Sequence, residues 1–122
     1  MVLKINDNEY EVHFGIGFVR KLDEKYFVKN QAGIKFGTGL ETKIPFLLTG
    51  DVVTLSELLY EGTCAEKKRP TQAQVDTYVD NVEDIEALFD EVVEELKKHN
   101  ATKTKIRELQ ENLRKQEKVQ GN

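Results

Sequence analysis

The stretch from Asp80 to Asn100 constrains the fold of this chain more than any other segment. Its apolar side chains recur at spacings of three and four, which places them on one face of a helix. These side chains are Val82, Ile85, Leu88, Phe89, Val92, Val93 and Leu96. Acidic residues fill the other faces and lysines close the last turn, as the helix dipole favours. The pattern predicts one long acidic amphipathic helix, capped near Asp80, that buries its apolar face in the core.

The segment after this helix is mostly polar, and its few apolar residues form only one narrow stripe. From Thr102 to Lys118 it is rich in helix formers, and its apolar contacts are little more than Ile106, Leu109 and Leu113. An isolated helix of this kind is marginal in water, so the stripe must dock on something. We interpret these three residues as candidate protein-binding residues. They contact either the acidic helix of their own chain or a neighbouring copy.

The charge distribution is compatible with both alternatives. Residues 80–98 carry eight acidic side chains against two lysines, a balance of −6, whereas residues 99–122 carry a balance of +3. Because exposed ion pairs are weak and screened by salt, contacts between copies would also be weak. We favour the neighbouring copy and predict a weak homo-oligomer.

The first residues alternate between apolar and polar side chains, which is typical of a half-buried strand. Leu3 and Ile5 share one side of a first strand, and Tyr10, Val12 and Phe14 share one side of a second. The intervening residues 6–8 (Asn-Asp-Asn) tolerate turn conformations. No alternation follows Phe14, so we expect an N-terminal β-hairpin and strands confined to about the first 15 residues.

Helix signals dominate the rest of the chain. We expect a first helix over about 15–26 and a second that begins at a Thr38-x-x-Glu41 capping pattern and runs to Leu48. A third helix covers 52–63 after the N-cap Asp51, and a short fourth helix follows a second capping box at Thr71. Pro45 lies inside the second of these, so either that helix kinks or its regular part begins near Pro45. Residues 27–37 are expected to form a loop. The fold class is therefore α+β, mainly α-helical, with an N-terminal β-hairpin followed by about six helices. Residues 1–100 form a single domain, and residues 101–122 form a polar C-terminal helix that frays from about Gln116.

Composition excludes several classes of function. The chain has 122 residues and a net charge of −4, so it lacks the basic field that attracts nucleic acid. No apolar run approaches the roughly 20 residues that span a bilayer, so we expect no membrane partner. Its single cysteine, Cys64, and two histidines, His13 and His99, form no local cluster of nucleophile, base or ligands. We therefore expect no catalytic, cofactor or metal site. We interpret Cys64 as a semi-buried thiol and His99 as a partner of the helix C-terminal dipole.

Several segments, in order and spacing, resemble the tail assembly chaperones of long-tailed phages and prophages of Gram-positive bacteria. The resemblance covers roughly residues 1–100 and is carried by residues 14–23 (FGIGFVRKLD), 36–40 (FGTGL), 44–51 (IPFLLTGD), 58–63 (LLYEGT) and 84–92 (DIEALFDEV). Most of these are core and capping residues, so their combined order and spacing carry the signal.

The resemblance implies a non-enzymatic assembly factor. Such proteins bind the tape-measure protein, keep it soluble and help recruit tail-tube subunits, often through a longer frameshifted form. They act in the host cytoplasm during assembly and are absent from the mature virion. The family offers no catalytic residues to carry over. The alternative from another class is a small phage- or bacterium-encoded adaptor or inhibitor that acts through its acidic helix, and a small enzyme is a remote third.

Overall fold

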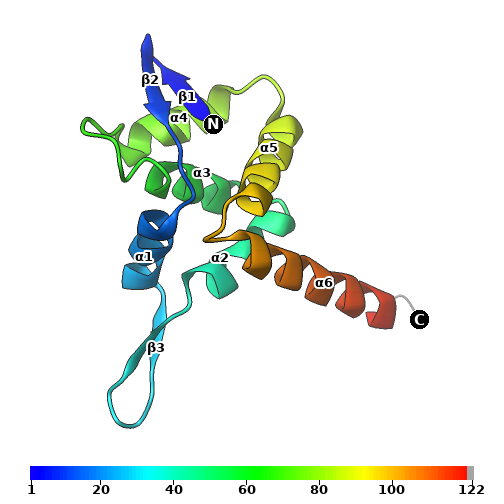
Figure 1. The fold of residues 1–122 in the computed structure, drawn as a ribbon. Coiled ribbons are helices and arrows are strands. Elements are labelled where there is room, and N and C mark those ends of the chain that lie inside the picture. The colour runs from blue at the N-terminus through cyan, green and yellow to red at the C-terminus, as the bar shows by residue number, and fades with distance from the viewer. Residues whose placement is uncertain (121–122) are drawn as a thin grey trace.

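The computed structural model describes the backbone of residues 1–120 and the side chains of residues 1–118. Along these residues the elements are β1 (Val2–Ile5), β2 (Asn8–Glu11), α1 (Ile16–Lys25), β3 (Phe27–Lys29), β4 (Lys35–Gly37), α2 (Gly39–Leu48), α3 (Val52–Glu61), α4 (Gln72–Asn81), α5 (Ile85–Lys98) and α6 (Lys103–Gln120) (Figure 1). The expected fold class is confirmed: the structure is α+β and mainly helical, with an N-terminal hairpin and six helices.

The N-terminal hairpin forms where the alternation places it. Strands β1 and β2 are antiparallel, with Ile5 opposite Asn8, so two residues make the turn. Those residues, Asn6 and Asp7, both have positive φ values (50° and 67°), which a two-residue hairpin turn requires and which Asn and Asp tolerate. Leu3 and Ile5 point into the core, and β1 packs against α4.

Helix α3 forms the centre of the core. Leu55, Leu58 and Leu59 have no exposed surface, and α3 contacts α1, α2, α4 and α5 (Figure 1). The chain after β2 crosses the end of α3 closely, since the His13 N–H donates to the Gly62 carbonyl oxygen over 2.8 Å. A Cβ atom at Gly62 would lie 2.5 Å from Val12 Cγ1, so this crossing requires a glycine.

A second hairpin replaces the loop expected at residues 27–37, so the prediction that strands stop near residue 15 is wrong. Strands β3 and β4 pair antiparallel, with Val28 opposite Phe36, and extend away from the helices (Figure 1). Each strand has only three residues, too few to produce a period-two signal in the sequence. Gly33, with φ at 81°, closes the connecting loop.

The long acidic helix is also divided, contrary to the expectation of one helix from Asp80 to Asn100. Helix α4 ends at Asn81, Val82 is extended, and α5 begins after Asp84. The N-cap is Asp84 rather than Asp80: its Oδ1 accepts a hydrogen bond from the Ala87 N–H at 3.0 Å. The predicted apolar stripe keeps its role, because Leu88, Val92 and Leu96 are buried and the rest of it is half-buried.

Two capping predictions have different outcomes. The capping box at Thr71 forms, with Thr71 and Gln74 exchanging both side-chain-to-backbone bonds. The Thr38–Glu41 box does not form, because Thr38 makes no side-chain cap to the backbone. Instead Oδ1 of Asp23, on α1, accepts from the Gly39 N–H at 2.9 Å and so caps α2 from a neighbouring helix. Helix α2 is continuous from Gly39 and contains Pro45, which places its start at Thr38 rather than at Pro45.

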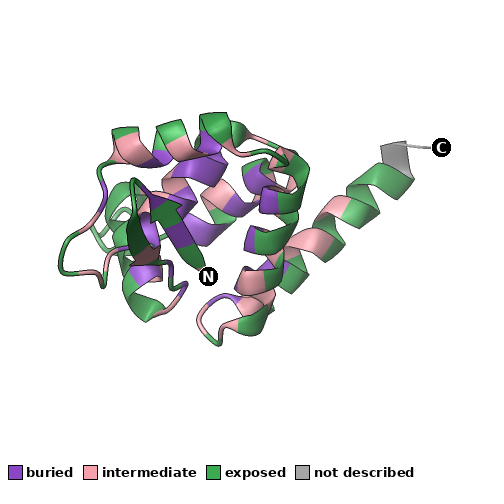
Figure 2. Cartoon of the chain, turned by 90° about the horizontal axis from the view of Figure 1, so that it is seen from above, coloured by how far each residue is buried: buried purple, intermediate pink, exposed green. Residues whose placement is uncertain are grey.

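Helix α6 packs with its first half and projects with its second (Figures 1 and 2). It lies against α2 and α5, where Thr102 and Ile106 are buried and Leu109 packs on the core. The core therefore continues past residue 100. The helix extends through Gln120, and the end of the tail expected to fray, residues 121–122, lies outside the described residues. In the part of the chain that the structure describes, no helix is long and apolar enough to cross a bilayer.

Candidate functional site: surfaces for protein binding

The side chains that could act as nucleophiles, bases or metal ligands are dispersed over the structure. Among the described residues, no group of three or more His, Cys, Asp or Glu side chains is placed to hold a metal ion. Cys64 is half-buried, as predicted, and its Sγ lies beside Gly17.

The two histidines, distant in sequence, contact each other. The rings of His13 and His99 have centroids 5.0 Å apart in an edge-to-face arrangement, and Phe14 lies against His99. His99 is the C-cap of α5, where its Nδ1–H donates to the Glu95 carbonyl oxygen at 2.7 Å. The ring therefore satisfies a terminal carbonyl, which is the helix-end position that the sequence predicted for it.

A paired polar network ties α1, α2 and α3 together. Glu57 accepts from the Tyr26 hydroxyl at 2.6 Å and from Lys43 Nζ at 3.0 Å, while Lys25 Nζ donates to the buried Glu61 at 3.0 Å. Burial and then the Glu57 carboxylate raise the pKa of Tyr26. Burial acts to lower the pKa of Lys43, but the hydrogen bond and charge of Glu57 outweigh it and the pKa is raised. Because each group has its partner, the network fixes three helices and leaves no free acid or base.

The predicted binding stripe on α6 divides into two parts. Ile106 is 1% exposed and belongs to the core of its own chain, and Leu109 packs against that core. Leu113 is half-buried and belongs to the second half of α6 (Lys103–Gln120). Of the two alternatives, the structure therefore shows the first half of the stripe folding back on its own chain. The opposite charges of residues 80–98 and 99–122 contribute little to this packing. Lys105 pairs with Glu41 of α2, and no ion pair joins α5 to α6 among the described residues.

The second hairpin presents an exposed apolar surface that the sequence reading missed. Val28, Ile34 and Phe36 are 56%, 55% and 51% exposed. A signal for it was present, since two apolar pairs flank a glycine-containing loop at residues 27–28 and 34–36. We name Val28, Ile34 and Phe36 the hairpin face.

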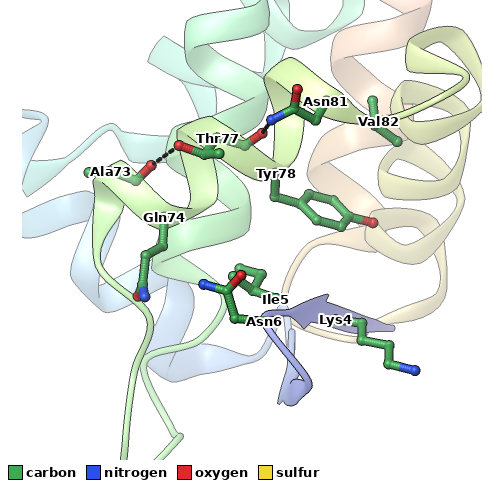
Figure 3. Close-up of a pocket in the computed structure, with 9 residues that line it drawn as sticks. All are labelled: Lys4, Ile5, Asn6, Ala73, Gln74, Thr77, Tyr78, Asn81 and Val82. Atoms are coloured by element: carbon green, nitrogen blue, oxygen red, sulfur yellow. Dashed lines mark hydrogen bonds between the residues drawn. The ribbon is translucent and has the colours of Figure 1, made fainter.

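Two of the grooves on the described surface contain apolar side chains from neighbouring elements. One, of about 410 Å³, lies between the N-terminal hairpin and α4, where Ile5, Tyr78 and Val82 provide its apolar walls and Asn6 and Gln74 its amides (Figure 3). The other, of about 500 Å³, lies between the end of α2, α5 and α6. We name the second the α5 groove; its half-buried apolar residues are Leu48, Phe89 and Val93, and its charged residues are Glu86 and Asp90.

Exposed apolar surface on a small, mainly helical scaffold, as on the hairpin face, is typical of a protein that binds other proteins. The chain matches the family model described as "Phage tail assembly chaperone protein, TAC" over residues 2–111. It therefore belongs to the phage tail assembly chaperone family. Comparison with curated proteins and with solved structures gives no match.

Proposed function

We propose that this chain binds the tape-measure protein of its phage and keeps it soluble until the tail tube forms around it. The observation that carries the proposal is the family match across residues 2–111. A tape-measure protein is long, helical and apolar until it is packed inside the tube, so a chaperone must cover apolar surface reversibly. The hairpin face and the two grooves are surfaces on which an amphipathic segment can dock.

The proposal includes two further partners. Tail-tube protein is recruited through a longer form of this chain, made by a ribosomal frameshift, and copies of the chain associate weakly with one another. Several weak contacts along one long client raise the overall affinity by avidity. Leu113, which is not packed against the core of its own chain, is the part of the predicted stripe still available to another chain. The protein acts in the host cytoplasm and is released before the virion is complete.

Co-expression tests the central part of this proposal. The full chain is produced together with the tape-measure protein encoded by the same phage, and the soluble fraction of the tape-measure protein is measured after centrifugation. We expect the tape-measure protein to be soluble and to co-purify with the tagged chain. An unrelated small helical protein at the same expression level is the control. A tape-measure protein that is equally insoluble with both would contradict the proposal.

A further inference from the structure

The hairpin face offers a partner apolar contact without charge. Its side chains share one side of the β3–β4 pair, where Val28 lies directly opposite Phe36. Lys29 and Lys35 lie on the other side of the hairpin, with their Nζ atoms 6.0 and 4.1 Å from the centre of the Phe27 ring. A surface of this kind favours apolar partners in general and does little to select among them.

The groove between the N-terminal hairpin and α4 has polar walls that are largely engaged within α4. The Thr77 hydroxyl donates to the Ala73 carbonyl oxygen at 3.0 Å, and the Asn81 amide donates to the Thr77 carbonyl oxygen at 2.9 Å (Figure 3). Gln74 is held in the capping box of α4. A single charge, that of Lys4, lies among the residues that line this groove. It therefore offers a partner little polarity for recognition.

The α5 groove places an acidic row beside an apolar row. Phe89 and Val93 are four residues apart on α5 and form the apolar row, which Leu48 at the end of α2 extends. Glu86 and Asp90 are also four residues apart and form the acidic row. Each apolar residue on α5 lies three positions beyond an acidic one, so the two rows are neighbours on the helix surface. The groove therefore has two chemically distinct parts in a fixed order.

The acidic row forms no ion pair in the part of the chain that the structure describes. Glu86 and Asp90 are both exposed, and neither is paired with a lysine of α5. The arginines of α6 do not pair with them either, because Arg114 pairs with Glu111 and Arg107 makes no ion pair among the same residues. Two unpaired carboxylates beside apolar side chains fit a partner that is both apolar and cationic.

We propose that the α5 groove binds a helical segment of the tape-measure protein that carries a row of basic residues beside a row of apolar ones. The identity of the client rests on the proposed function, to which we add the surface and the kind of segment. A groove of about 500 Å³ holds a few side chains and not a whole helix, so the client helix lies along it with one face. Client residues at i and i+4 then contact the apolar row, and a neighbouring row of Lys or Arg faces the acidic row.

A second copy of the chain does not supply such a segment from its basic helix. Helix α6 carries six basic against three acidic side chains, but its apolar stripe is largely used at home. Ile106 is buried in the core of its own chain, and Leu109 packs against that core. Leu113 remains, and one apolar residue does not fill a groove of this size.

Charge reversal in the acidic row tests the proposal with the full chain and the tape-measure protein encoded by the same phage. Glu86→Lys with Asp90→Lys should lower the amount of tape-measure protein retained by the tagged chain by about tenfold or more, because like charges then meet across the groove. Glu86→Gln with Asp90→Asn should cause a smaller loss. Glu9→Lys with Asp80→Lys, both exposed and outside the groove, changes the net charge equally and should leave retention unchanged. Because all four side chains are exposed, the circular dichroism spectrum should stay the same.

Overlapping peptides that span the tape-measure protein identify the segment. In fluorescence anisotropy titrations, the peptides bound by the wild-type chain should have apolar residues at i and i+4 and Lys or Arg in the neighbouring row, and binding should weaken as salt is raised. Replacing those basic residues by glutamate should abolish binding to the wild type and restore it to Glu86→Lys with Asp90→Lys. This restoration is the decisive result, since a misfolded variant would not gain affinity for the reversed peptide.

Several outcomes would overturn this inference. They are equal retention by the charge-reversal and control variants, bound peptides without basic residues, or a reversed peptide that fails to bind the reversed groove. Loss of retention in Phe36→Ser, with normal retention in the groove variants, would place the client on the hairpin face instead. A change in self-association of the groove variants without loss of the client would assign the groove to contacts between copies.

Failure of this inference is distinguishable from failure of the chaperone role. In each of these cases the wild-type chain still retains the tape-measure protein, so the chaperone role stands. A wild-type chain that retains no tape-measure protein would contradict the chaperone role and the assignment of the groove together.

Discussion

Replacement of Ile106 by alanine tests whether α6 belongs to the core of its own chain. Ile106 is 1% exposed, and its N–H donates to the Thr102 carbonyl oxygen in the first turn of the helix. The change removes three carbon atoms, worth about 2.4 kcal/mol at about 0.8 kcal/mol for each buried methylene. The cavity left behind raises the expected loss in the free energy of unfolding to about 3 kcal/mol.

Leu113→Ala is the matched control on the same helix. Leu113 is half-buried and is not among the apolar residues packed against the core, so its truncation should cost less than about 1 kcal/mol. Urea unfolding followed by circular dichroism distinguishes the two. At a slope of about 2 kcal/mol per molar urea, Ile106→Ala should lower the midpoint by about 1.5 M. The shift should be the same at every protein concentration.

Two results would refute this reasoning. Equal, small losses for the two variants would mean that Ile106 does not lie in the core. A loss for Ile106→Ala that depends on protein concentration would mean that the stripe docks on a neighbouring copy, as the sequence alone led us to favour.

Further predictions concern packing, pH and chemistry. Gly62→Ala should destabilise the fold by about 1–3 kcal/mol in urea unfolding, because its Cβ would lie 2.5 Å from a buried valine; an unchanged midpoint would contradict the close crossing. The hydrogen bond from Thr54 lowers the pKa of Asp51, so this carboxylate stabilises the fold above its unfolded pKa, and that contribution is lost as the pH falls below about 4. The stability difference between wild type and Asp51→Asn should therefore shrink in acid, and a constant difference would exclude this effect. His13→Ala, His99→Ala and Cys64→Ser should each leave tail assembly largely intact, and loss of assembly by a stably folded member of this set would contradict the expectation of a non-enzymatic role.

The sequence predicted the elements that have strong local signals. The N-terminal hairpin could be predicted because Leu3 and Ile5 alternate with polar residues, and because Asn6 and Asp7 permit positive φ values. The apolar stripe of α5 was readable because its spacing persists over several turns. Thr71 was readable as a cap because both halves of the box lie within four residues.

The predictions that were wrong concern features that depend on contacts distant in sequence or on competing local signals. Asp23 caps α2 from α1, so the local Thr38 pattern gave the right start for the wrong reason. The break at Val82 falls inside a continuous helical periodicity, so the spacing of apolar residues led us to place the cap near Asp80 and not at Asp84. The burial of Ile106 depends on α6 packing against both α2 and α5, which no short stretch of sequence shows.

The candidate surfaces were the least predictable part. The hairpin face arises because β3 and β4 project from the helices, whereas exposed apolar residues in a sequence look the same as buried ones. The α5 groove is formed where the end of α2 meets α5 and α6, which lie more than 35 residues further along the chain.

Deletion of the gene for this chain in the phage that encodes it tests the central claim most directly. Lysates of the deletion phage, with and without the chain supplied in trans, are compared by counting tailed particles in electron micrographs and by measuring tape-measure protein in the soluble fraction. The account predicts filled heads without tails and insoluble tape-measure protein, with both defects reversed by the supplied chain. Normal tails and soluble tape-measure protein in the deletion phage would contradict it.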